Sequence, residues 1–144
     1  MLGLIQKVSM ASVEVAGKVA GKIDMGLLLL LGIEKQDTSR NVERLLNKVV
    51  SYRVFPDERG HMNLSLLDVK GALLIVSQFT LVADTGKGLR PSFSSGAQPA
   101  KARQLYDEFV AASGTLCPTS SGEFGADMNV HLVNSGPVTF ILQG

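Results

Sequence analysis

Polar side chains follow a short apolar run in the middle of the chain, where chemistry is easiest to build. Ala72–Val76 are all apolar, and Ser77, Gln78, Phe79 and Thr80 come directly after them. The run has the length of a buried strand, and an unpaired polar group at its end costs about 1–3 kcal/mol. Either the Thr80 hydroxyl acts as a nucleophile, or the backbone amides of Gln78, Phe79 and Thr80 donate to a developing oxyanion. The alternative without chemistry is a capped strand end.

A side-chain nucleophile needs a base, and the sequence offers few. The only histidines are His61, in a polar loop, and His131, on an alternating strand. Both positions are more typical of surface or core histidines than of catalysts, and no Ser-His-Asp arrangement can be built from them. Cys117 is the only cysteine, and no HExxH spacing is present. We therefore expect no metal site and no cofactor.

Positive charge gathers after the polar stretch. Lys87 lies between two glycines, but a phosphate-binding P-loop also needs an earlier Gly and a following Ser or Thr, which are absent here. Between positions 84 and 103 the single acid Asp84 stands against four basic residues: Lys87, Arg90, Lys101 and Arg103. They form either a solvated face or a patch that contacts phosphates. The sequence leaves both interpretations open.

Gly136 and Pro137 are the second candidate site. They follow Asn134 and Ser135 and lie between two strand-like segments, so the interpretation without a functional role is a hairpin turn. The alternative is a cis peptide bond, which about 5–6% of X–Pro bonds adopt in folded proteins. A cis bond there would present a rigid wall without side chains.

Apolar periodicity predicts the elements that position these residues. The expected strands are Leu2–Val8, Ser12–Val15, Met25–Ile33, Ala72–Val76, Met128–Leu132 and Val138–Leu142, with a turn before Ile23. A first helix is expected over Val42–Val50, capped by Asp37, Thr38 or Ser39, and a second from Pro99 to Gly114. Segments 56–63 and 115–125 read as loops.

These elements, about seven strands and two helices, predict one mixed α/β domain over residues 1–144. We expect mixed β-sheets forming a partly barrel-like core with the two main helices packed on it. A net charge of +1 implies no general affinity for polyanions. A lone cysteine, no apolar run of membrane-spanning length and no signal peptide together predict a cytoplasmic protein.

Two motifs resemble those of a known family. SQFTL at Ser77–Leu81 and NSGPVT at Asn134–Thr139 are together similar to the signature motifs of D-aminoacyl-tRNA deacylase. Five further stretches agree with this resemblance: LIQKV at 4–8, Asp84-Thr85, GLRPSF at 88–93, LYDEF at 105–109 and FGADM at 124–128. The resemblance covers essentially the whole chain, and both motifs stand in the expected order and at the expected separation.

The resemblance implies a homodimeric hydrolase that binds the 3′ end of aminoacyl-tRNA. It would cleave the ester between a D-amino acid and the terminal adenosine, and would also act on glycine mischarged onto alanine tRNA. Carried onto this sequence, Ser77, Gln78, Phe79 and Thr80 line the catalytic site, with the substrate's 2′-hydroxyl assisting. Gly136 and Pro137, as a cis pair reaching into the partner's site, reject L-aminoacyl groups.

The resemblance also implies contacts to the adenine and the tRNA, and the sequence departs from the family at one position. Phe124 and Met128 would help to hold the adenine, while Lys87 and Arg90 would contact the tRNA. Lys7 stands where family members usually have Arg, a residue that helps to hold the partner's Gly-Pro loop, and Lys lacks the planar fork of Arg. Two alternatives to this function are a Thr80-nucleophile esterase and a non-catalytic binder of tRNA ends.

Overall fold

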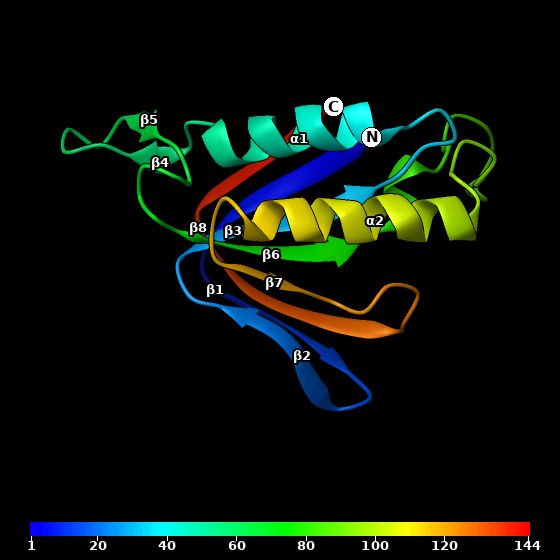
Figure 1. Ribbon diagram of the computed structural model, residues 1–144, viewed down its shortest axis with the longest axis horizontal. Coiled ribbons are helices and arrows are strands. Elements are labelled where there is room, and N and C mark those ends of the chain that lie inside the picture. The colour runs from blue at the N-terminus through cyan, green and yellow to red at the C-terminus, as the bar shows by residue number, and fades with distance from the viewer.

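A curved six-stranded sheet carries both main helices on one face (Figure 1). The computed structural model describes residues 1–144. In chain order its elements are β1 (Leu2–Val15), β2 (Lys18–Ile23), β3 (Gly26–Gly32), α1 (Ser39–Ser51), β4 (Phe55–Pro56), β5 (Met62–Leu64), β6 (Ala72–Ser77), the 3-10 turn η1 (Phe79–Val82), α2 (Pro99–Gly114), β7 (Thr119–Ser121) and β8 (Met128–Gln143). The mixed α/β class and the two helices are confirmed.

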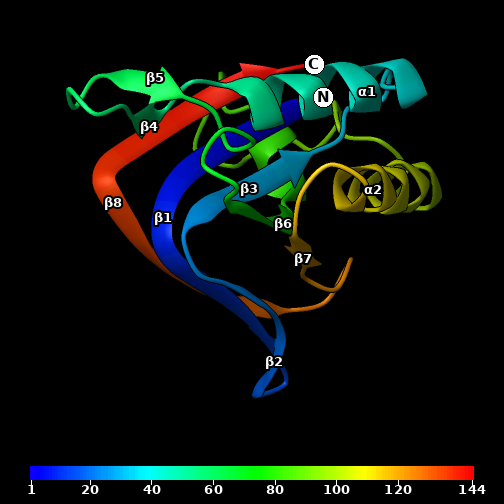
Figure 2. The same cartoon turned by 60° about the vertical axis from the view of Figure 1, so that its left-hand side comes forward.

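Strand β1 is the centre of the sheet because it pairs with three other strands. Its first half pairs antiparallel with β3, its second half with β2, and its whole length with β8. The prediction of two separate strands, 2–8 and 12–15, is wrong. The chain continues through Val8–Met10 with two register shifts against β8 instead of breaking. Figure 2 shows the consequence, two long strands that curve together around the molecule.

Strands β3 and β6 run parallel and are buried on both faces, as their unbroken apolar sequences predict. Leu27, Leu29 and Ile75 pack under the helices in one cluster. Leu28 and Leu74, on the opposite face, fill a second cluster enclosed by the curved sheet. The strand that leads to the candidate site is therefore fixed from both sides.

The sheet curls toward closure through β7, so the prediction of a loop over residues 115–125 is wrong for Thr119–Ser121. Thr119–Ser121 pairs parallel with Leu73–Ile75 of β6. On its other side, the Ser120 hydroxyl donates to the Lys22 carbonyl of β2 at 3.1 Å. A side chain at Gly21 would meet the Ser121 carbonyl at 2.7 Å, so glycine is needed for this approach. The predicted partly barrel-like core is present.

The helices agree with their predicted periodicity. Helix α1 buries the expected apolar residues Val42, Leu45, Leu46, Val49 and Val50. Its N-cap is Thr38, whose backbone amide donates to the Asn41 side chain at 3.0 Å. Helix α2 begins at Pro99, buries Leu105, Tyr106 and Phe109, and ends at Gly114. No helix is long and apolar enough to cross a membrane.

The last two predicted strands are also one. Residues 128–143 form the continuous strand β8, so a tight hairpin turn at 134–137 is a wrong prediction. The reason is that β8 stays paired with β1 on both sides of this segment, and the irregularity is absorbed as a register shift. Leu132, on the apolar side of the alternating segment, is nevertheless 36% exposed. The predicted 56–63 loop connects β4 and β5, which form a short antiparallel pair.

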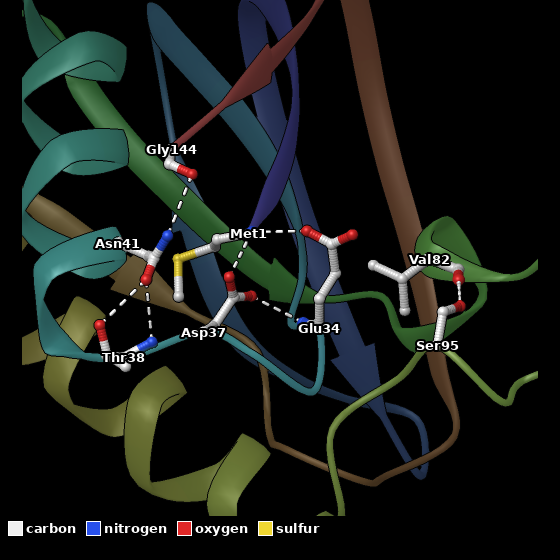
Figure 3. A network of polar contacts seen from close by, with 8 residues as sticks. All are labelled: Met1, Glu34, Asp37, Thr38, Asn41, Val82, Ser95 and Gly144. Atoms are coloured by element: carbon white, nitrogen blue, oxygen red, sulfur yellow. Dashed lines mark hydrogen bonds and ion pairs between the residues drawn. The ribbon is translucent and has the colours of Figure 1, made fainter.

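The two ends of the chain meet beside α1 (Figure 3). The α-ammonium of Met1 donates to Asp37 at 2.5 Å and to Glu34 at 2.7 Å, and both Met1 and Asp37 are buried. The second carboxylate oxygen of Asp37 accepts from the Glu34 amide. Asn41 donates to the carbonyl of Gly144 at 3.2 Å. This network holds the outer ends of β1 and β8 against the start of α1.

Removing the charge of Asp37 should destabilise the fold. In the Asp37→Asn variant the buried ammonium keeps only the partly exposed Glu34 as an anionic partner. We expect the free energy of unfolding, measured by urea titration, to fall by about 2–3 kcal/mol, since breaking a buried ion pair is costly. Asp107→Asn is the control, because Asp107 pairs with Arg103 on the surface at 3.6 Å and should change stability little. Equal free energies of unfolding for the two variants would show that the charge of Asp37 does not stabilise the fold.

Candidate active site

A cavity of about 480 Å³ lies at the carboxyl end of β6. Its walls come from five parts of the chain: the end of β3, the polar end of β6, the loop before α2, the start of α2, and the segment leading into β8. The lining residues include Ser77, Gln78, Phe79, Phe93, Ala97, Ala102, Phe124, Asp127 and Met128. The structure thus brings most of the predicted catalytic and adenine-binding residues to one place.

The end of β6 leaves backbone donors free at this cavity. The Gln78 amide still donates to Leu31 of β3 at 2.9 Å, after which the chain turns into η1. The first hydrogen bond of η1 runs from the Leu81 amide to the Gln78 carbonyl, so the backbone amides of Phe79 and Thr80 have no partner within that turn, and no loop carbonyl or side chain accepts from either. Gly32 permits the turn, since a side chain there would lie 2.8 Å from Val82. Two unpaired amides therefore follow a strand that is fixed on both faces.

The side chains at the strand end are accessible. Phe79 is 67% exposed, and its ring centroid lies 5.0 Å from that of Phe93. The Gln78 side-chain amide donates to the Thr80 hydroxyl. Thr80 itself is exposed and does not line the cavity. The Thr80 hydroxyl is therefore engaged with a neutral amide, and no base contacts it.

Phe93 lines the cavity, although it is not among the predicted site residues. It ends the GLRPSF stretch in the loop between η1 and α2. Asp84 and Ser92 exchange two backbone hydrogen bonds across this loop, and the Ser95 hydroxyl donates to the Val82 carbonyl (Figure 3). These ties hold Phe93 against Phe79. The only sequence signal was its place in a stretch shared with the family.

The basic residues divide into two groups. Lys87 and Arg90 are exposed on the loop and do not line the cavity. Lys101 donates to the Lys35 carbonyl at 2.6 Å, and Arg103 pairs with Asp107. Of these four residues, only Lys87 and Arg90 form no hydrogen bond or ion pair within the chain. A four-residue basic patch does not form, and the loop tip is the part open to a phosphate.

Gly136 and Pro137 lie away from this cavity in the same chain. Both are exposed, and the peptide bond between them is cis. The Asn134 side chain braces the segment: its oxygen accepts from the Val138 amide at 2.8 Å, and its nitrogen donates to Thr139 at 2.9 Å. Asn134 belongs to the second motif but was not among the predicted site residues. The pair is thus presented outward on a firm support.

Other candidate groups take no part in the cavity. Neither histidine lines it, and His131 lies 3.6 Å from Glu14 on the surface. No group of three or more His, Cys, Asp or Glu side chains is placed to hold a metal ion. Lys7 forms no ion pair within the chain. The cavity and its rim offer a pair of free amides, neutral polar side chains, the Asp127 carboxylate and aromatic faces, a set suited to an ester carbonyl beside a flat ring.

Comparison with known proteins agrees with this arrangement. Residues 4–143 match the family model described as D-Tyr-tRNA(Tyr) deacylase. Relatives named D-aminoacyl-tRNA deacylase include those of Shewanella sediminis (strain HAW-EB3), 60% identical, and Pseudomonas putida (strain W619), 57% identical, each over 99% of both chains. A solved structure named c-Myc DNA Unwinding Element Binding Protein superposes with a TM-score of 0.95 at 36% identity, covering 100% of this chain and 99% of that one.

These matches define the class of enzyme, a hydrolase that acts on the ester bond of aminoacyl-tRNA. The chain belongs to the D-Tyr-tRNA(Tyr) deacylase family. The resemblance drawn from the two motifs is thereby confirmed. A purely non-catalytic binder of tRNA ends is set aside.

Proposed function

We propose that the protein hydrolyses the ester between a D-amino acid, or glycine mischarged onto alanine tRNA, and the 3′ adenosine of tRNA in the cytoplasm. The observation that carries the proposal is the pair of unpaired amides, Phe79 and Thr80, at the rim of an aromatic-lined cavity. An ester carbonyl seated there gains donors exactly where charge develops during attack.

The reaction needs little side-chain chemistry. Water adds to the ester carbonyl, and the negative charge on its oxygen is stabilised by the free amides. The bond from the carbonyl carbon to the ribose oxygen then breaks, the water's proton passes to that oxygen, and the amino acid leaves as a free acid. The neighbouring 2′-hydroxyl of the substrate assists this proton transfer. This assignment accounts for a cavity that holds no histidine.

The rest of the cavity suits the terminal nucleoside. Phe124 and Met128 also line the cavity and provide flat or polarisable apolar contacts for adenine. Lys87 and Arg90 at the exposed loop tip are placed to meet phosphates further along the strand. Recognition is then concentrated on the end of the tRNA, which fits a chain with a net charge of only +1.

Discrimination between D- and L-aminoacyl groups is assigned to Gly136 and Pro137 of a second subunit. A wall of bare main chain blocks an L side chain while accepting any D side chain or glycine. Support for a dimer comes from β8, which pairs with a strand on one side only and exposes Leu132, Val133 and Ile141. An unpaired apolar edge of this kind is normally covered. In an isologous dimer each chain would complete the site of the other.

The dimer can be tested by dilution. Specific activity per chain should fall as the protein is diluted below its dimer dissociation constant, and sedimentation should show the monomer appearing over the same range. Full activity from a species shown to be monomeric would refute the shared site.

The central test compares D-tyrosyl-tRNA with L-tyrosyl-tRNA. Release of labelled tyrosine should be rapid from the first and close to the uncatalysed rate from the second. Equal rates on both would remove the case for chiral rejection. A protein that released neither would refute the proposed reaction itself.

A second mechanism is favoured by one observation, the accessibility of the Thr80 hydroxyl. If Thr80 were a covalent nucleophile, Thr80→Ala would abolish turnover. We expect instead that this variant keeps kcat within about fivefold of the parent, because its backbone amide remains and no base contacts the hydroxyl. Single-turnover hydrolysis of D-tyrosyl-tRNA measures this directly, and a loss of more than about 10³-fold would establish the covalent route.

A further inference from the structure

We infer that Tyr106 is a positioning residue, which sets the adenine-facing wall of the cavity at its working distance from the end of β6. Tyr106 lies on α2 and does not line the cavity. The inference rests on the proposed function, since it assumes that this cavity receives the terminal adenosine.

The hydroxyl of Tyr106 lies within hydrogen-bond distance of two backbone carbonyls that belong to different segments of the chain. It is 3.0 Å from the Ile75 carbonyl of β6 and 3.2 Å from the Gly122 carbonyl. Ile75 precedes Ser77 by two positions, and Gly122 precedes Phe124 by two. A single group therefore bridges the strand that ends in the free amides and the segment that carries the aromatic wall.

The ring of Tyr106 supports the same wall. Its centroid lies 5.5 Å from that of Phe124, with the planes tilted by 48°. Phe124 lines the cavity, whereas Tyr106 is only 3% exposed. Helix α2 thus holds Phe124 from behind through a ring contact and fixes the backbone before it through a hydroxyl.

If Tyr106 only stabilised the core, removing its hydroxyl would lower the stability of the fold more than it moved the segment before Phe124. The Ile75 carbonyl also accepts from the Gly122 amide at 2.9 Å, so it stays paired if the hydroxyl is removed. The Gly122 carbonyl accepts no other hydrogen bond within the chain, but Gly122 is partly exposed, so water can replace the tyrosine. Loss of the hydroxyl should therefore move the segment before Phe124 more than it destabilises the core. Burial also raises the pKa of Tyr106 to about 12, which keeps it a proton donor at any working pH.

The test compares Tyr106→Phe with Tyr52→Phe, the only other tyrosine. Tyr52 lies beside Phe140 at the end of α1, and its hydroxyl forms no hydrogen bond in the structure. For Tyr106→Phe we expect the KM for D-tyrosyl-tRNA and the Kd for adenosine 5′-monophosphate to rise about tenfold, the value of one hydrogen bond, with kcat within about threefold. Tyr52→Phe should match the parent in all three.

A double-mutant cycle separates positioning from general damage. In a Phe124→Leu background the added Tyr106→Phe change should raise the Kd for adenosine 5′-monophosphate by less than about twofold, because the wall that Tyr106 supports is already gone. Three results would each overturn the inference. The effects of the two substitutions on the Kd could be additive, the Kd could be unchanged in Tyr106→Phe, or the parent could fail to bind the nucleotide. A parent that binds the nucleotide but does not hydrolyse D-tyrosyl-tRNA would refute the proposed reaction alone, and the nucleotide arm would still decide the role of Tyr106.

Discussion

Gly136→Ala should lower the ratio of kcat/KM for D-tyrosyl-tRNA over L-tyrosyl-tRNA by at least about tenfold. Gly136 has φ +147°, a conformation that alanine rarely adopts, and an added Cβ would lie 2.6 Å from the Val138 side chain. Holding alanine in such a conformation costs about 1–3 kcal/mol, so the segment should shift to relieve it. A displacement of about 1 Å in a group that selects substrates changes rates by up to about 10²-fold.

The matched control is Gly114→Ala at the end of α2. A side chain at Gly114 meets nothing within 4 Å, and its φ lies outside the left-handed range. This variant should keep both the parent's ratio and its stability. If Gly136→Ala kept the parent's ratio as well, the segment would have no part in discriminating between D and L substrates.

Phe79→Pro should reduce kcat by about 10²–10³-fold relative to Phe79→Ala, the usual cost of losing one oxyanion donor. Both variants remove the exposed ring and its contact with Phe93, but only proline removes the backbone amide. The backbone accommodates the change because Phe79 begins a 3-10 turn, where proline is tolerated, and the preceding Gln78, with φ −138° and ψ 81°, lies outside the α region that a following proline disfavours.

Pre-steady-state hydrolysis of D-tyrosyl-tRNA is the appropriate measurement, because it isolates the chemical step from product release. The two variants should unfold at similar temperatures, since Phe79 is largely exposed. Equal rate constants for the proline and alanine variants would show that the amide of Phe79 does not stabilise the transition state.

Much of the fold follows from local patterns. The spacing of apolar residues from Val42 to Val50 predicts α1 because one face of a helix must be buried. The unbroken apolar runs of β3 and β6 predict strands covered on both sides, and the structure places their alternate residues in two separate clusters. In each case the signal lies within a few consecutive residues.

The errors arise where pairing between distant segments overrides local pattern. β7 is only three polar residues, Thr119–Ser121, and becomes a strand because β6 lies beside it. The sequence around Gly136 reads as a turn, yet β1 continues alongside and keeps β8 extended. Positions 9 and 10 look like a break between two strands, yet β1 continues through them because β8 is paired alongside. A pattern in consecutive residues does not show which strand will pair with them across the sheet.

The candidate site shows the same division. The polar end of β6 was visible directly, whereas Phe124 and Met128 came only through family resemblance. Charge pattern could not show that Lys101 and Arg103 are engaged with the Lys35 carbonyl and Asp107. Tyr106 reads as one more apolar position on α2, and its two carbonyl partners become evident only in three dimensions.

The pairing of β1 with β8 has a consequence for how the protein is made. Residues 2–15 and 128–143 form one ladder, so nearly the whole polypeptide separates the two partners. Contacts between such distant segments form slowly, because a very large loop must close first. On the ribosome, β1 waits for β8, and the sheet is finished only once the sixteen residues of β8 have left the exit tunnel.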